Sequence, residues 1–191
     1  MTSISALESI HKKGLFGDYE DKNENKLTKI QERKNLLIIQ IVQYKKSSAS
    51  ITDINLDDLN LTNEAHKVIS NDDTRILWCG PKNWLFISTK KDLLTNIKQT
   101  LKEMDFAVTD LSHSRAIIEL EGENSKEILK KGCPFNFNKL KKNNCVNSVF
   151  HGITITVDMI DDNPNKIRLF ALRSFGESLY HSITDAMKKF G

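Results

Sequence analysis

The chain has 191 residues, of which 39% are hydrophobic and 28% charged, and its formal net charge is only +3. Its lysines lie in scattered pairs rather than gathered with aromatic residues in one stretch, which argues against a nucleic-acid-binding protein. No apolar run approaches the ~20 residues that span a bilayer, and the first residues lack a signal-peptide pattern, so we expect a cytoplasmic protein with no membrane partner.

Residues 1–34 predict an N-terminal arm and polar linker ahead of a single domain at residues 35–191. Residues 15–33 are highly charged and hold too few apolar side chains to form a core. Ahead of them is a small apolar stripe at helical spacing, which we expect to dock on a partner protein. A frayed terminus is the alternative interpretation. The stripe consists of Ile4, Leu7 and Ile10.

Several segments of the remaining chain have the composition and alternation of β-strands. Between two of them, residues 80–83 (G-P-K-N) predict a tight turn. Residues 47–70 are rich in turn residues and leave their structure open. The predicted strands are residues 36–44, 75–79, 84–88, 106–108, 115–120, 145–150, 153–160 and 166–172.

The strand at residues 115–120 is predicted to be half-buried. Ala116, Ile118 and Leu120 lie on one face of it. Arg115 and Glu119 lie on the other face, where we expect solvent.

Two internal helices are predicted from capping residues and apolar spacing. The first begins after Asp92. The second begins at Asn124 or Ser125 and ends at Gly132, which offers the left-handed conformation that stops a helix. The apolar face expected for the first helix consists of Leu94, Ile97, Leu101 and Met104.

A third helix is predicted at the C-terminus, where Ser174 and Glu177 match the S-x-x-E capping box. Strands that follow one another directly, interleaved with helices, indicate an α+β fold in which a mixed or antiparallel sheet packs with helices. The residues expected on the apolar face of this helix are Leu179, Ile183, Met187 and Phe190.

The polar residues do not match a catalytic site. Asp110 and Ser112 share one turn with His113, and such close neighbours cannot form a triad, so we expect the first two to bond backbone amides locally. Arg115 and Arg173 each lie at the edge of a strand. Guanidinium groups suit carboxylates and partner surfaces, so Arg115 and Arg173 are candidates for ligand or partner contacts. Asp110 and Ser112 are candidates for such contacts as well. We predict no catalytic residue.

The three cysteines form no C-x-x-C pair, and the histidines show no ligand spacing, so we predict reduced thiols and no metal site. Neither a G-x-G-x-x-G sequence nor a Walker loop is present, so we predict no nucleotide site of those kinds.

Three blocks of sequence together carry a resemblance to a known family. They are W-C-G-P-K-N-W-L-F at residues 78–86, the segment at residues 108–137 that contains D-L-S-H-S-R-A-I-I-E-L-E-G, and R-L-F-A-L-R-S-F-G-E-S-L-Y at residues 168–180. In this order and spacing the chain resembles the gamma subunit of heterotetrameric sarcosine oxidase. The resemblance implies a fold similar to the tetrahydrofolate-binding T protein, an aminomethyltransferase.

The resemblance also implies a non-catalytic structural subunit. The complex would demethylate sarcosine to glycine oxidatively and transfer the one-carbon unit to tetrahydrofolate, and this chain would have no activity alone. The implied partners are the alpha and beta subunits and a small delta subunit. FAD, FMN, NAD and tetrahydrofolate would be bound on other subunits, and this chain would bind no cofactor.

One departure bears on the alternative, a stand-alone folate-binding one-carbon module similar to T protein. T proteins carry a glycine pair followed by adjacent acids that handle the folate amine. The comparable segment here, H-G-I-T-I-T-V-D-M-I-D-D at residues 151–162, has one glycine, and threonines in place of those acids. We therefore do not assign folate chemistry to Asp158, Asp161 or Asp162.

Overall fold

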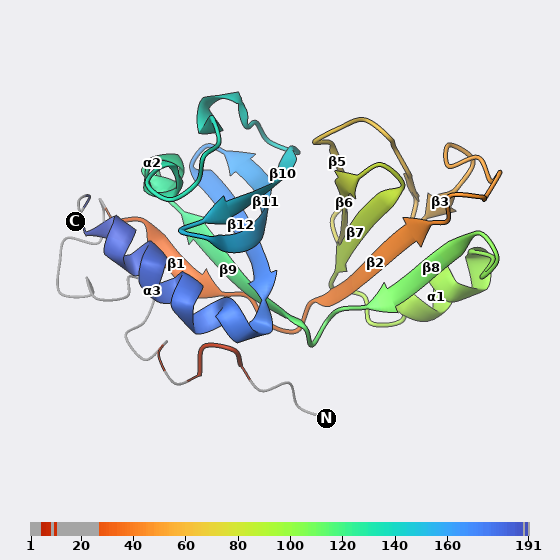
Figure 1. Cartoon of the computed structure of the whole chain (residues 1–191), viewed down its shortest axis with the longest axis horizontal. Coiled ribbons are helices and arrows are strands. Elements are labelled where there is room, and N and C mark those ends of the chain that lie inside the picture. Colours follow the sequence, from red (N-terminus) through yellow and green to blue (C-terminus); the bar gives the residue numbers. More distant parts are fainter. Residues whose placement is uncertain (1–4, 9, 11–26, 189, 191) are drawn as a thin grey trace. The chain divides into compact units, whose positions relative to one another are not determined.

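The computed structural model describes residues 5–8, 10, 27–188 and 190, and it divides the chain into two compact units (Figure 1). The first unit comprises residues 1–34, 114–142 and 146–191, and the second comprises residues 35–113 and 143–145. This division differs from the predicted arm at residues 1–34 and single domain at residues 35–191. The physical reason is strand pairing, because the strand that precedes residue 35 pairs with one far along the chain.

The first unit is a five-stranded sheet with helices on one face. Its strand order is β1-β9-β12-β11-β10, and β9 pairs antiparallel with both β1 and β12. The strands are β1 (Lys29–Glu32), β9 (Arg115–Glu121), β10 (Cys145–Phe150), β11 (Ile153–Asp162) and β12 (Asn165–Leu172). The helical segments are α2 (Ser125–Lys130), η3 (Phe137–Lys139), η4 (Arg173–Phe175) and α3 (Gly176–Met187).

The core of the first unit lies between this sheet and its two α-helices. Leu179 and Ile183 of α3 and Ile128 of α2 are fully buried against Ile118 and Leu120 of β9. Figure 1 shows α3, in blue, running along the sheet beside β1 and β9. The predicted apolar face of the C-terminal helix is thereby confirmed for Leu179, Ile183 and Met187.

The second unit has its own sheet and its own core. The sheet order is β5-β6-β7-β2-β8, with α1 packed against it, and β3 and β4 form a separate two-stranded hairpin. The strands are β2 (Leu37–Gln43), β3 (Asn55–Leu56), β4 (Leu59–Asn60), β5 (Val68–Ser70), β6 (Thr74–Gly80), β7 (Asn83–Ser88) and β8 (Phe106–Asp110), and the helix is α1 (Leu93–Thr100).

The starts and ends of the helices differ from the sequence predictions. No side chain caps α3, because a 3₁₀ turn at Arg173–Phe175 occupies the place of the predicted capping box. Gly132 after α2 has no left-handed φ. A Cβ there would lie 2.8 Å from the Phe150 ring, so this glycine serves close packing. Helix α1 ends at Thr100, and Met104 beyond it is 79% exposed rather than on the apolar face.

No helix in the described part of the chain is long and apolar enough to cross a membrane.

Candidate functional site

Asp110 and Ser112 close a local turn in the second unit, as the sequence predicts. The Ser112 amide and hydroxyl both donate to Asp110 Oδ1, at 2.9 and 2.6 Å. Ser112 Oγ in turn accepts from the amide of Ile38 at 2.9 Å, which joins the turn to the start of β2. Burial raises the pKa of Asp110, but the hydrogen bonds from Ser112 outweigh that effect and hold it below its usual value.

Arg115 and Arg173 lie in the first unit, at one end of its sheet. Arg115 begins β9 and faces Leu172, the last residue of β12, in the strand register. The Arg173 amide donates to the Ser114 carbonyl at 2.9 Å, which fixes the chain as it leaves β12. Strand pairing therefore brings together two arginines that are distant in sequence. Their role in contacting a ligand or partner stays a prediction.

The structure describes two of the three residues of the N-terminal stripe. Leu7 is fully buried in the core of the first unit, and Ile10 packs partly buried against that core, whereas Ile4 falls outside the described residues. The Glu32 carboxylate accepts from the Ala6 amide at 3.0 Å and from the Ser5 hydroxyl. Leu7 and Ile10 thus pack on their own chain, because β1 and α3 offer them an apolar site, and a partner-docking role of the stripe stays a prediction.

A network in the first unit surrounds Glu119, which the sequence analysis assigned to a solvated face. Only 1% of its side chain is exposed. Arg168 Nη2 lies 2.9 Å from Glu119 Oε2, and Gln31 Nε2 and Lys166 Nζ lie 3.1 and 3.3 Å from Oε1. These partners come from the flanking strands β1 and β12, and the Arg33 side chain adds a longer ion pair at 3.8 Å.

The electrostatics of Glu119 follow from these partners. Burial raises its pKa, but the charges of Arg168, Lys166 and Arg33 and the Arg168 hydrogen bond outweigh burial, so the pKa lies below the usual 4.5. Asp158 is also fully buried and faces Arg168 in the register of β11 and β12. This row of charged side chains crosses neighbouring strands on the sheet face opposite the helices.

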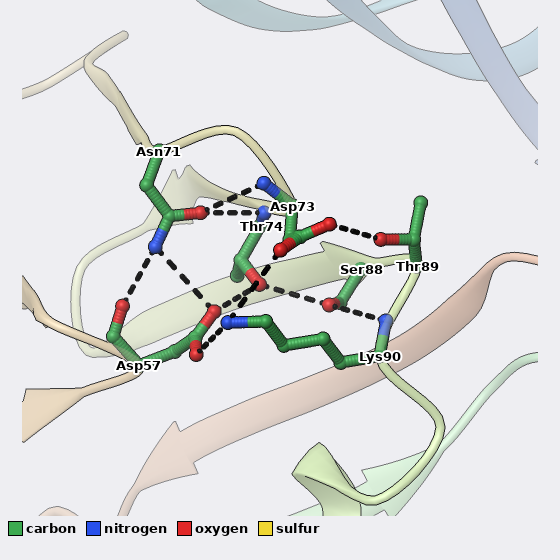
Figure 2. A network of polar contacts seen from close by, with 7 residues as sticks. All are labelled: Asp57, Asn71, Asp73, Thr74, Ser88, Thr89 and Lys90. Carbon is green, nitrogen blue, oxygen red and sulfur yellow. Dashed lines mark hydrogen bonds and ion pairs between the residues drawn. The ribbon is translucent and has the colours of Figure 1, made fainter.

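A second network joins loops and strand ends of the second unit (Figure 2). Asp57 and Asp58 both have left-handed φ angles, 56° and 62°, as a two-residue hairpin turn between β3 and β4 requires. Asp57 Oδ1 lies 2.6 Å from Lys90 Nζ, and the Thr74 hydroxyl donates to Oδ2 of the same carboxylate. Thr74 Oγ1 lies 2.8 Å from Ser88 Oγ, across the paired strands β6 and β7.

Asn71 completes this network from the turn before β6. Its side-chain oxygen accepts from the amides of Asp73 and Thr74, and its Nδ2 donates to the Asp57 carbonyl at 2.7 Å. Burial raises the pKa of Asp57, but hydrogen bonds from Lys90, Thr74 and Asn71 outweigh it and the pKa is lowered. The network thus fastens the hairpin to the sheet. Sequence analysis missed it because its members span residues 57–90.

The remaining reactive groups lie in separate places. Burial raises the pKa of the Cys133 thiol to about 11, which disfavours the nucleophilic thiolate. Cys145 Sγ lies 3.2 Å from the Trp78 carbonyl oxygen. Among the residues that the structure describes, no three His, Cys, Asp or Glu side chains gather as a metal site. A hollow of about 470 Å³ is lined by Lys131, His151, Ser182, Asp185 and Ala186.

The carboxylates of both networks hold basic side chains of their own chain in place. Glu119 accepts from three flanking residues, and Asp57 accepts from Lys90 and Thr74. In both networks the printed partners of the carboxylate are residues of the same unit. The Glu119 network connects neighbouring strands of the first unit, and the Asp57 network connects a hairpin turn to the sheet of the second unit, so both contribute to structure.

Comparison with known proteins points to one family. The model of the sarcosine oxidase, gamma subunit family matches residues 51–189. A curated relative, sarcosine oxidase subunit gamma of Corynebacterium sp. (strain U-96), is 27% identical over 120 residues, which cover 61% of this chain and 58% of that protein. The match thus spans less than two thirds of the relative's length.

Two solved structures share the fold. One chain of heterotetrameric sarcosine oxidase from Corynebacterium sp. U-96, in complex with pyrrole 2-carboxylate, aligns with 100% of this chain and 97% of its own length, at a TM-score of 0.80 and 19% identity. Aminomethyltransferase T of the glycine cleavage system from Bartonella henselae aligns over 82% of this chain and 45% of its own, at a TM-score of 0.61 and 9% identity. The predicted T-protein-like α+β fold is confirmed.

Proposed function

The chain belongs to the sarcosine oxidase gamma subunit family, and on that premise we propose that it is a non-catalytic structural subunit of a heterotetrameric sarcosine oxidase. The match of the family model over residues 51–189 carries the proposal, since it covers parts of both units. The complex would demethylate sarcosine to glycine oxidatively and pass the one-carbon unit to tetrahydrofolate. This chain would support that reaction without touching the reacting atoms.

We propose alpha, beta and small delta subunits as the partners, in the cytoplasm, with FAD, FMN, NAD and tetrahydrofolate bound on subunits other than this one. The ion pairs within this chain support the proposal that the reaction takes place on other subunits. Glu119 and Asp57 are engaged by Arg168 and Lys90, so neither carboxylate is placed to accept a proton from a substrate amine. The Cys133 thiol, with its raised pKa, is likewise poorly suited to attack a substrate.

The alternative function is a stand-alone folate-binding module. The likeness to aminomethyltransferase T concerns the fold alone, because only 9% of the aligned residues are identical. In this chain Thr154 and Thr156 of β11 stand in the segment where T proteins carry their acids. Without those acids the chain lacks the groups that would handle the folate amine, which favours the structural role.

Purified chain tests the two functions directly. We expect the isolated protein to be colourless, to form no peroxide from sarcosine, and to bind tetrahydrofolate no better than an unrelated protein does in equilibrium dialysis. A yellow protein, or peroxide formation by this chain alone, would contradict the non-catalytic role. Saturable tetrahydrofolate binding by the isolated chain would support the folate-binding module instead.

A further inference from the structure

The sheet of the second unit has two edge strands, and they differ in what lies beside them. Beside β5, the Val68 amide donates to the Asn143 carbonyl at 2.9 Å. The Cys145 amide donates to the His66 carbonyl at 2.8 Å. Residues 143–145 belong to the same unit, so the β5 edge is covered from within that unit. Strand β8 lies at the other end of the sheet order, and no strand of the described residues pairs with its outer side (Figure 1).

The pairing of β8 with β2 determines which backbone groups of β8 point outward. The Leu111 amide donates to the Ile38 carbonyl of β2 at 2.8 Å, in the same antiparallel register as β8. Along an antiparallel strand, the N–H and C=O of one residue point to the neighbouring strand and those of the next residue point away. The backbone of Thr109 therefore points to β2, whereas Val108 and Asp110 direct both groups away from it. We call the outward N–H and C=O groups of Val108 and Asp110 the outer edge of β8.

The outer edge of β8 is available to another strand. Within the part of the chain that the structure describes, neither Val108 nor Asp110 has a backbone hydrogen bond on this side. The Phe106 amide donates to the Lys102 carbonyl at 3.0 Å, so the unpaired stretch begins after that amide. Thr109 and Asp110 are exposed and Val108 is half-buried, so water reaches the strand.

The sequence of β8 lacks most of the features that keep sheet edges apart. Natural edge strands avoid pairing with other chains through lysines, prolines, bulges or a covering segment. Strand β8 reads F-A-V-T-D, with its one charged residue at the end, and its register with β2 runs without a bulge. Phenylalanine, valine and threonine favour extended backbone. An edge of this kind can accept a strand from another chain, with main-chain hydrogen bonds providing the affinity.

The size of the edge indicates what kind of chain occupies it. Strand β8 has five residues. A strand of this length extends about 17 Å and buries far less than the roughly 1,200 Å² of a stable interface, so paired β8 strands alone would not hold two copies of this chain together. A partner subunit that also contacts this chain elsewhere can add such a strand, because the pairing then supplies only part of the contact.

We propose that an extended segment of a partner subunit of the sarcosine oxidase complex pairs with the outer edge of β8 and extends the sheet of the second unit by one strand. The assignment rests on the proposed function, since that function supplies the partner. It goes further by naming the element of this chain that makes the contact and the backbone groups that it uses.

Hydrogen exchange at single-residue resolution tests the pairing. The isolated chain is compared with the complex purified through a tag on the alpha subunit. The amides of Val108 and Asp110 should exchange at least about tenfold more slowly in the complex, because carbonyls of the added strand accept from them. The Thr109 amide points to β2, so it is the internal control and should be protected in both samples.

Two results of the exchange experiment would overturn the proposal. One is equal exchange of the Val108 and Asp110 amides in the isolated chain and in the complex. The other is protection of these amides in the isolated chain that rises with its concentration, which would assign the edge to a second copy of this chain.

A proline at the outer edge provides the matching mutation. Val108→Pro removes an N–H that points away from β2, so the sheet keeps its own hydrogen bonds, and it should lower the retention of this chain in the tagged complex about tenfold. Val108→Thr is the matched control, because it keeps the N–H and the branched shape of the side chain, and its retention should stay within about twofold of wild type.

Thermal unfolding of each isolated variant shows whether it is folded, and the exchange experiment decides if Val108→Pro is not. Wild-type retention of a folded Val108→Pro chain would overturn the pairing while leaving the subunit role intact. Failure of the wild-type chain to co-purify would instead overturn the proposed function, and the pairing with it.

Discussion

The two units each hold a carboxylate in a network of hydrogen bonds and ion pairs, but in different surroundings. Glu119 in the first unit lies on β9, between two neighbouring strands, and its side chain is 1% exposed. Asp57 in the second unit lies in a hairpin turn, with 11% of its side chain exposed, and its partner Lys90 is 40% exposed. The first carboxylate is enclosed by its partners, whereas the second stays close to water.

The two carboxylates should therefore differ in how much they contribute to the stability of their units. A buried carboxylate needs its cations, because removing one member leaves an uncompensated charge away from water. A carboxylate near the surface gains less from its partner, since water and salt screen the pair. We therefore expect the first unit to depend strongly on Glu119 and the second unit to depend weakly on Asp57.

The largest effect should come from adding a carboxylate without partners to the first unit. Leu179 is fully buried in its core, so Leu179→Asp should cost several kcal/mol, comparable to a total stability of about 5–15 kcal/mol, and prevent soluble folding. Soluble yield and thermal unfolding measure this. Ser178→Asp on the exposed side of α3 is the control and should fold normally. A soluble Leu179→Asp protein with unchanged melting would show that this face of α3 is not buried.

Neutralising the enclosed carboxylate should have the next largest effect. Glu119→Gln keeps the shape of the side chain but removes the buried anion that faces Arg168 and Lys166, and Lys166 then keeps only its ion pair with Glu121. The loss of this anion should lower the free energy of unfolding by about 3 kcal/mol. Urea unfolding at neutral pH measures the change. Glu121→Gln is the matched control, because Glu121 pairs with the same Lys166 but is 32% exposed, and it should cost less than about 1 kcal/mol. Equal losses of unfolding free energy in Glu119→Gln and Glu121→Gln would contradict the claim that the buried carboxylate matters more than the exposed one.

The N-terminal segment should also stabilise the first unit, because Leu7 belongs to the core of that unit. In the isolated chain Leu7→Ala should lower the free energy of unfolding by about 2–3 kcal/mol through loss of burial and the cavity left behind. Met104→Ala, at an exposed site of the second unit, should change it by less than about 0.5 kcal/mol. An isolated Leu7→Ala chain as stable as wild type would show that this residue does not stabilise its own unit and would favour the prediction that it docks on a partner.

The smallest effect should come from the carboxylate near water. Asp57→Asn keeps the left-handed turn, which Asn tolerates, and should cost about 1 kcal/mol or less at pH 7. The folded-state pKa of Asp57 is below its ordinary value of 3.8, so its stabilisation is complete above pH 3.8 and is lost as pH falls through the folded-state pKa. The difference between wild type and variant should therefore vanish in acid. Asp58→Asn, in the same turn, is the control for the substitution itself. If the difference in unfolding free energy between wild type and Asp57→Asn grew as the pH fell, the pKa of Asp57 would be shifted in the opposite direction and the prediction would be wrong.

Sequence patterns predicted the parts of the fold that depend on near neighbours. The strand at residues 145–150 has the predicted bounds, and the turn of Asp110 and Ser112 was expected because its bond spans two residues. The division into two units was missed because it follows from the pairing of β1 with β9, which alternation along one strand does not reveal.

Burial of the charged residues was missed for the same reason. Glu119 alternates with apolar residues and so predicts a solvated face, yet its register opposite Arg168 encloses it. The packing of Leu7 in the core of its own unit was missed because an apolar stripe indicates burial without indicating against which surface. The sequence indicated Arg115 and Arg173 separately, each at the edge of its own strand. Only the pairing of β9 with β12 places the two residues at the same end of the sheet.

Omission of this chain from the complex tests the central claim, a structural role within a heterotetrameric sarcosine oxidase, most directly. The alpha, beta and delta subunits are co-expressed with and without this chain, and the tagged complex is analysed by size exclusion and sarcosine oxidation. We predict that this chain elutes with the alpha subunit in equal amount, and that its omission lowers the yield of the full-size, active complex. A complex of the same activity and thermal stability without this chain, or separate elution of the chain, would contradict the structural role.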